Sequence, residues 1–248
     1  MPAETAFDIL QMPFDGLAAY WLSIKKLTDS KKGRGVVDQE IEGTEEPFVR
    51  HVLELAFCEL PSGTARRMIE ARMDTRLEQY AARLELMRLA AMAVASGENP
   101  RMTLIRMHSL FAEPPIDEDK AFAMANGLTD GLTAPGADLP TLLVVDHRQP
   151  EDRLVVKLLF YVLCGRREGP QALLPYLEYP HLPLFAEGLA QAVDGFDAAF
   201  VSEHMQGVAQ RLLDATRRKM QMSMEMALGI RARYSYADIY RIARSYMP

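Results

Sequence analysis

The chain has 248 residues, of which 49% are hydrophobic and 25% charged, and its formal net charge is -6 with a pI near 5.5. That length suits one large domain or two small ones and is sufficient to bury an apolar core. A nucleic-acid-binding protein usually carries a basic domain or stripe, so the acidic balance argues against nucleic acid as a partner.

The two cysteines and the hydropathy pattern bear on where the protein resides. Cys58 and Cys164 each lie in an apolar run, as is typical of buried reduced thiols, and do not make a disulfide framework. The N-terminus lacks a positively charged region followed by a long apolar core, so we predict no signal peptide. No stretch of about 18 uncharged apolar residues occurs, so no transmembrane segment is predicted. We expect a cytoplasmic protein that is membrane-peripheral only through its partners.

Glycines and prolines divide the first half of the chain into pieces of helical length. Between them, apolar residues from Ile69 to Met87 recur at steps of three and four, which predicts a long helix that begins at Ser62 and ends at Gly97. Asn99 followed by Pro100 is typical of an N-cap and first helical residue, so a second helix is expected through about residue 112.

The stretch from about residue 127 to 150 has the weakest helical pattern. Residues 142–145 fit a short strand or a loop with one helical turn, and we prefer the loop because a single strand would have no partner. From residue 150 helical periodicity returns, with a long helix near 196–228 and a last one at 235–246, which Ser235 and Asp238 begin as a capping box. We expect an all-α fold, a multi-helix bundle or irregular helical array, with helical domains at 1–128 and 150–248 and a linker or loop at 129–149.

Few residue patterns indicate catalysis or metal binding. No phosphate-binding glycine loop occurs, and the five histidines stand apart without helical ligand spacing. Asp146 and His147 resemble half of a catalytic pair, but no nucleophile elbow accompanies them, and we interpret them as an exposed polar step. Met220, Met222 and the alternate methionines that follow favour adaptable packing or a protein-binding surface over a metal site. We therefore expect no cofactor, no metal and no enzyme.

Three segments in the first half share their order with one known family. KKGRGVVDQEIEGTEEPFVRHVLELAF at residues 31–57, the helix-like TARRMIEARMDTRLEQY at 64–80 and LELMRLAAMAVASGENPRMTLIRMHSLF at 84–111 resemble the cytoplasmic part of MotA-type flagellar stator subunits. The two membrane-spanning helices that separate the last two segments in that family are missing here. The resemblance covers about a third of the chain and implies a soluble helical domain that does not conduct ions, since an ion path needs protein across the bilayer.

In that family a basic and an acidic side chain eight residues apart contact the rotor, and the resemblance places these roles on Lys32 and Glu40, counted from Gly35. Lysine replaces the family's frequent arginine, which weakens a bidentate contact but keeps the charge. Arg34 can compensate. The alternative, a solvated basic turn, remains equally open.

Residues 173–190, 200–215 and 233–246 show a fainter likeness to the C-terminal domain of the rotor switch protein FliG. Leu177, Glu178, Leu182, Leu184 and Gly188 match in register. Glu187 departs, because the family tends to have lysine there. This likeness implies that Glu178 and Glu187 belong to a partner-binding surface.

Together these likenesses predict a protein–protein interaction component of the bacterial flagellar motor that binds rotor or stator components through a charged helical surface. Two alternatives stay open. One is a helical adaptor or scaffold unrelated to motility, and the other is an enzyme whose site is assembled from distant residues, such as Asp146, His147 and an arginine in a deep pocket. Neither the oligomeric state nor the identity of the partner follows from the sequence.

Overall fold

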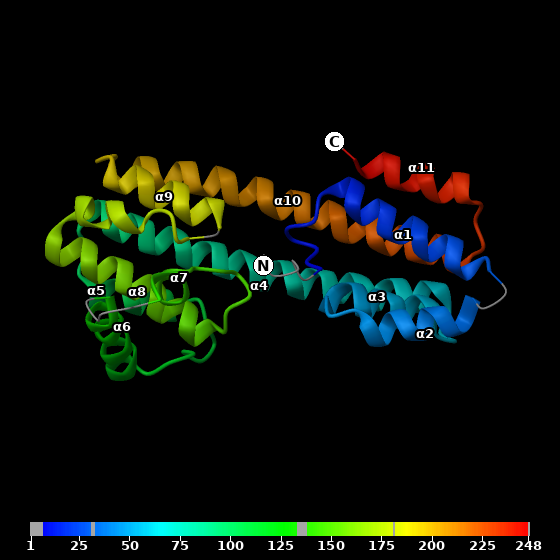
Figure 1. The fold of residues 1–248 in the computed structure, drawn as a ribbon, viewed down its shortest axis with the longest axis horizontal. Coiled ribbons are helices and arrows are strands. Elements are labelled where there is room, and N and C mark those ends of the chain that lie inside the picture. Colours follow the sequence, from blue (N-terminus) through cyan, green and yellow to red (C-terminus); the bar gives the residue numbers. More distant parts are fainter. Residues whose placement is uncertain (1–6, 31–32, 133–137, 181, 248) are drawn as a thin grey trace. The chain divides into compact units, whose positions relative to one another are not determined.

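The computed structural model describes residues 7–30, 33–132, 138–180 and 182–247, and within these ranges it is all-α, without a strand (Figure 1). The expected fold class is thereby confirmed. The elements are α1 (Phe14–Thr28), α2 (Gly33–Gly43), α3 (Pro47–Phe57), α4 (Ser62–Ser96), α5 (Pro100–His108), α6 (Glu118–Leu132), α7 (Leu139–Leu143), α8 (Glu151–Glu168), the 3-10 helix η1 (Pro170–Tyr176), α9 (Pro183–Val193), α10 (Ala198–Arg231) and α11 (Tyr236–Tyr246).

Local capping signals determine several of these ends as predicted. Gly97 follows α4 with a φ of 63°, a left-handed conformation that favours glycine. The Asn99 side chain accepts a hydrogen bond from the backbone amide of Arg101 at 2.9 Å and begins α5. At α11 the Ser235 hydroxyl accepts from the amide of Asp238 at 3.1 Å. The predicted helical turn near residue 142 is confirmed as α7.

The chain forms two compact units, one of residues 1–78 and 212–248 and the other of residues 79–211. The first unit contains α1 to α3, the beginning of α4, the end of α10, and α11. Its core includes Trp21, Phe48 and Ile69, each fully buried. The alternate methionines of α10 are buried in the same core, so they serve packing. Although they alternate along the helix, all four are buried because this part of α10 is enclosed on several sides. They are Met220, Met222, Met224 and Met226.

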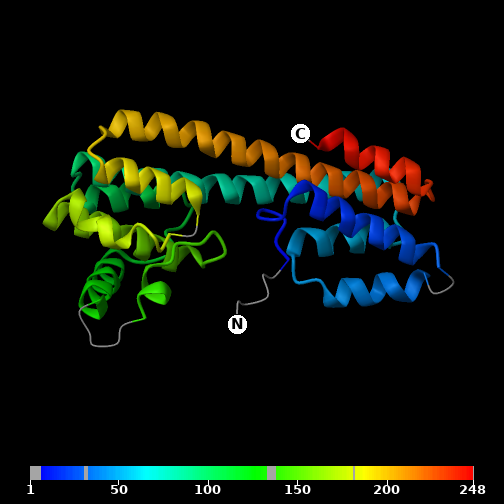
Figure 2. The ribbon, with the colours of Figure 1, turned by 45° about the horizontal axis from the view of Figure 1, so that its top comes forward.

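In the second unit α8 is the central helix, with eleven buried residues. Gly165 lets α8 approach the end of α4 closely, since a Cβ there would lie 3.1 Å from Val94 Cγ1. Helix α9 lies along the beginning of α10 in both ribbon views (Figures 1 and 2).

The segment predicted as a linker, residues 129–149, belongs in its described part to the second unit. Leu143 and Val145 are fully buried. The Tyr161 hydroxyl donates to the carbonyl of Leu143 at 3.0 Å, and Lys157 Nζ donates to that of Val144 at 2.7 Å. These contacts tie the segment to α8, so the two units do not follow the predicted division at 129–149.

Among the described helices, none combines the length and the apolar character that crossing a bilayer requires.

Candidate protein-binding surface

The connection between α9 and α10 is built by local signals in the sequence. Pro183 occupies the first turn of α9, and Gly195 follows that helix with a φ of 87°, which favours glycine. The Asp197 carboxylate then accepts hydrogen bonds from the backbone amides of Ala199 and Phe200, both at 2.9 Å. This cap fixes where α10 begins and therefore which way its first side chains point.

Close packing of α9 against α10 depends on Gly188. A Cβ at this position would lie 2.8 Å from Met205 Cε and 3.0 Å from its Cγ. Met205 is fully buried, so the absence of a side chain at Gly188 is what lets the two helices approach here. This close approach places Glu187, the residue before Gly188 on α9, beside α10.

Three aromatic side chains lie at the start of α10. Phe200 and His204 are four residues apart on α10 and share one side of the helix, and Phe196 lies in the connection just before it. The rings of Phe196 and Phe200 stack with centroids 4.7 Å apart, and that of His204 follows 6.4 Å from Phe200. Phe196 and Phe200 remain 46% and 45% exposed. Stacked rings exposed to this extent are unusual unless they contact a partner.

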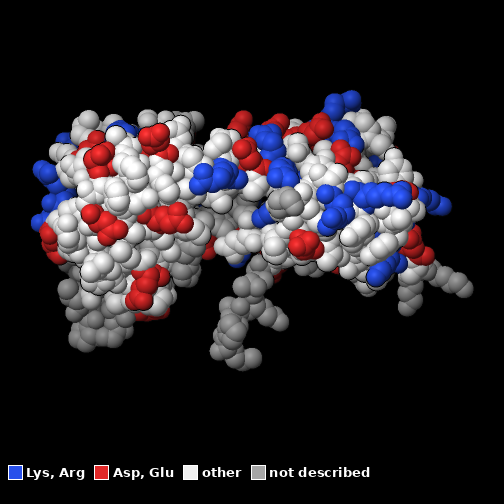
Figure 3. Space-filling view, turned by 90° about the horizontal axis from the view of Figure 1, so that it is seen from above, with Lys and Arg blue, Asp and Glu red and all other residues white. Residues whose placement is uncertain are grey.

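Carboxylates lie along the same stretch as this aromatic row, and Arg88 of α4 reaches the stretch through a hydrogen bond to the Ser202 hydroxyl. Glu187 Oε2 lies 3.6 Å from His204 Nε2, and Asp194, Asp197 and Glu203 are exposed in the same stretch. No lysine or arginine occurs from residue 178 to residue 210. In Figure 3 the part of the surface that carries α9 and the start of α10 shows Asp and Glu on a largely uncharged background. We call Glu187, Phe196, Phe200, Glu203 and His204 the acidic aromatic face.

Those partner-binding residues suggested by the sequence that the structure describes belong to different units. Lys32 lies outside the described residues, as does the side chain of Arg34, so their proposed contact with a rotor stays a prediction. Glu40 lies on α2 in the first unit, partly buried, and its Oε1 accepts a hydrogen bond from Thr44 Oγ1 at 3.4 Å. Glu178, exposed after η1, and Glu187 both belong to the second unit.

Glu40 also influences a half-buried tyrosine. Burial raises the pKa of the Tyr20 hydroxyl above its ordinary value, and the nearby Glu40 and Glu46 carboxylates act in the same direction. Glu40 thus lies against the α1 side of the first unit, and part of its side chain contributes to that packing.

Asp146 and His147 form a polar cluster with an arginine 64 residues away, Arg83. His147 Nδ1 lies 3.0 Å from Asp146 Oδ1, and this contact lowers the pKa of Asp146. His147 is buried, so our expectation of an exposed polar step was wrong for this residue. It is buried because the Tyr80 ring packs edge-on against it at 6.1 Å.

Arg83 binds the backbone at this cluster. Its guanidinium donates hydrogen bonds to the carbonyls of His147 and Gln149, the second at 3.0 Å. The arginine therefore holds the loop before α8 in place, a structural role in which its donors point at the main chain. Within the described ranges, no three His, Cys, Asp or Glu side chains lie close enough to hold a metal ion.

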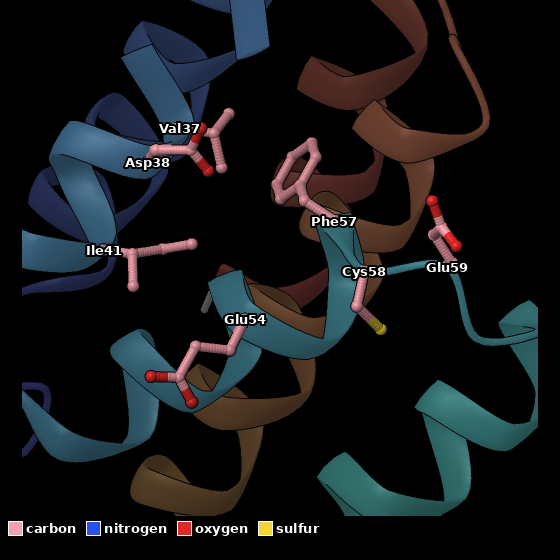
Figure 4. A pocket seen from close by; sticks show the side chains of 7 residues that line it. All are labelled: Val37, Asp38, Ile41, Glu54, Phe57, Cys58 and Glu59. Atoms are coloured by element: carbon pink, nitrogen blue, oxygen red, sulfur yellow. The ribbon is translucent and has the colours of Figure 1, made fainter. Parts of the chain in front are cut away.

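A hollow lies in the first unit between α2 and α3. It has a volume of about 530 Å³ and is lined by Val37, Asp38, Ile41, Glu54, Phe57, Cys58 and Glu59. Figure 4 shows Val37 and Ile41 of α2 pointing toward the side of Phe57, while the Glu54 carboxylate points away from that ring. The Cys58 thiol donates to the Leu55 carbonyl at 3.1 Å. The hollow is apolar between its helices and acidic at its border.

Sequence reasoning did not identify Phe196, Phe200 or His204. Aromatic residues at helical spacing more often face a core, and only the packing of α9 shows that this side of α10 is exposed. The absence of basic residues from 178 to 210 was the available signal.

Comparison of the chain with models of known families, with curated proteins and with solved structures finds no match.

Proposed function

We propose that this chain is a protein-binding component of the bacterial flagellar motor, which contacts a rotor or stator protein through a charged helical surface and conducts no ions. The acidic aromatic face carries this proposal. It combines exposed stacked rings with carboxylates on two packed helices, the composition of a surface that recognises another protein.

Support for the motor as the setting comes from the sequence alone. The ordered segments between residues 31 and 111 resemble the cytoplasmic part of stator subunits, and Glu187 falls in the segment that resembles a rotor domain. In this proposal the face on α9 and α10 supplies the binding energy mainly through Phe196 and Phe200, and the carboxylates steer association and set orientation.

A binding experiment with matched variants tests the proposal. The purified chain is titrated with the cytoplasmic parts of the rotor and stator proteins in a calorimeter, which measures the affinity. Phe200→Ala should weaken binding by at least tenfold, because aromatic anchors dominate interface energetics. Glu187→Lys should mainly slow association, which stopped-flow mixing of the same proteins measures. Glu113→Lys, the same charge change at an exposed position between α5 and α6 of the second unit, is the control and should bind as the unaltered chain does.

The outcomes separate the two candidate functions. Absence of binding to either class of motor protein, together with normal swimming of a deletion strain, would overturn the motor proposal. Capture of a protein unrelated to motility that is lost in Phe200→Ala and kept in Glu113→Lys would instead support a helical adaptor.

A further inference from the structure

Helix α11 in the first unit presents a second exposed aromatic surface. Tyr236, Tyr240 and Arg244 are spaced by four residues and share one side of the helix, with Arg241 next to them. All four are exposed. We call these four residues the tyrosine–arginine face.

Packing of the opposite side of α11 holds this face outward. Ile239 and Ala243 are fully buried in the core of the first unit. At Gly229 of α10 a Cβ would lie 2.8 Å from Ile239 Cδ1, so the two helices approach closely there. The orientation of α11 about its own axis is therefore fixed by its buried side.

The charge around this surface is positive. Residues 232–246 contain three arginines and one aspartate. The aspartate, Asp238, accepts from Arg241 at 3.0 Å, and Lys26 Nζ of α1 lies 5.3 Å from the centre of the Tyr236 ring. In Figure 3 Lys and Arg gather on the part of the surface that carries α11. An occupant of this face should be acidic and should offer aromatic or apolar side chains.

The acidic aromatic face of the same chain has this chemistry. We propose that the tyrosine–arginine face of one molecule binds the acidic aromatic face of a second copy, so that the chain associates head to tail. Guanidinium groups stack on exposed aromatic rings and form bidentate ion pairs with carboxylates. Arg244 and Arg241 would meet Glu187, Glu203 and the Phe200 ring in this arrangement.

The two faces differ, so the contact is heterologous and each molecule keeps one face free for the next copy. A contact of this kind, made by one helix on a helical pair, falls at the small end of protein interfaces and is weak. This inference rests on the proposed function, since it adds a competitor at the same acidic aromatic face. A second copy bound there excludes the motor protein, and partner binding would disperse the assembly.

Sedimentation velocity of the full chain alone tests self-association across protein concentration at low and high salt. The unaltered chain should show a sedimentation coefficient that rises with concentration at low salt, and the rise should shrink at high salt because charges drive the contact. A single species at monomer mass at every concentration and both salts would overturn the inference.

Charge reversals identify the two faces. Glu187→Lys with Glu203→Lys, and separately Arg241→Glu with Arg244→Glu, should each abolish the concentration dependence. A mixture of the two variants should restore it, because the unaltered face of each fits the other. All four changes in one chain should also restore it. Restoration shows that the variants are folded, and failure of both restorations contradicts the contact.

Self-association and the motor proposal fail separately in these experiments. A monomeric chain that still binds a rotor or stator protein through Phe200 overturns only the inference. Association that the mixed variants restore, without binding to any motor protein, overturns only the motor proposal.

Discussion

Replacing Arg83 with methionine should destabilise the second unit by about 2–4 kcal/mol. The guanidinium donates to the carbonyls of His147 and Gln149 and lies 3.8 Å from the Glu151 carboxylate. A hydrogen bond with a charged donor contributes roughly 1.5–3 kcal/mol. The ion pair adds at most about 1 kcal/mol, because the Glu151 side chain is 41% exposed and the pair is solvated. Methionine keeps the apolar stem but leaves both carbonyls without this donor. Water replaces part of the loss, since the Arg83 side chain is 21% exposed.

Urea unfolding followed by far-UV circular dichroism measures this change as a shift of the midpoint at unchanged slope. Arg83→Lys should lose part of the stability, because an ammonium group keeps the charge but not the planar fork. Arg153→Met, an equivalent change at an exposed position of α8 in the same unit, should alter the free energy of unfolding by less than about 0.5 kcal/mol. If Arg83→Met unfolds at the same urea concentration as Arg153→Met, the bonds to the loop carbonyls do not contribute as described.

Three further substitutions have expected outcomes. As pH falls from about 5 to 2, the Asp146→Asn variant should lose less stability than the unaltered chain. The pKa of Asp146 is lowered in the folded state, and the stabilisation from its charge disappears as pH falls through that pKa. Parallel curves of the urea midpoint against pH for the two proteins would contradict this. Gly188→Ala should lower stability by about 1–3 kcal/mol, because Met205 must move from a packed position. Gly207→Ala on α10 should not, because its Cβ would make only an ordinary contact at 3.6 Å with Arg211 Nη1. Equal thermal midpoints for the two variants would contradict the packing argument. Glu46→Gln should raise the urea midpoint at pH 7, because burial raises the pKa of Glu46 and its charged form costs stability, while the glutamine amide oxygen still caps α3. This gain in stability should shrink as pH falls through the pKa of Glu46 in the folded state. A gain that stays constant with pH would argue against a buried charge.

Helix ends were predictable from sequence wherever a local signal determines them. Gly97, Asn99 and Ser235 act through their own backbone conformation or side-chain hydrogen bonds, which neighbouring residues specify. The two compact units were not predictable in this way. Their boundaries fall inside α4 and α10, where no proline or glycine marks a break, and they arise from which distant helices pack on each half.

The candidate surface was predictable only in part. Glu187 was suggested by a likeness and lies in the acidic aromatic face, although its role there is a proposal. Phe196 and Phe200 were not suggested, because a helical spacing of apolar residues does not say whether another helix covers them. Arg83 was missed for a related reason, since its partners are backbone carbonyls 64 and 66 residues away that the identity of the side chains does not reveal.

Oxidation of the methionines enclosed in the core of the first unit reports how often that core opens. Peroxide oxidises an accessible thioether to a sulfoxide, and a buried one reacts only when the structure around it opens. Met68, 43% exposed in the same unit, should react without opening of the unit. Met220, Met222, Met224 and Met226 should react at a rate that opening of the unit controls. Each sulfoxide places a polar group in an apolar core and favours further opening. Oxidation of these four residues should therefore be cooperative, so that molecules carry all four sulfoxides or none.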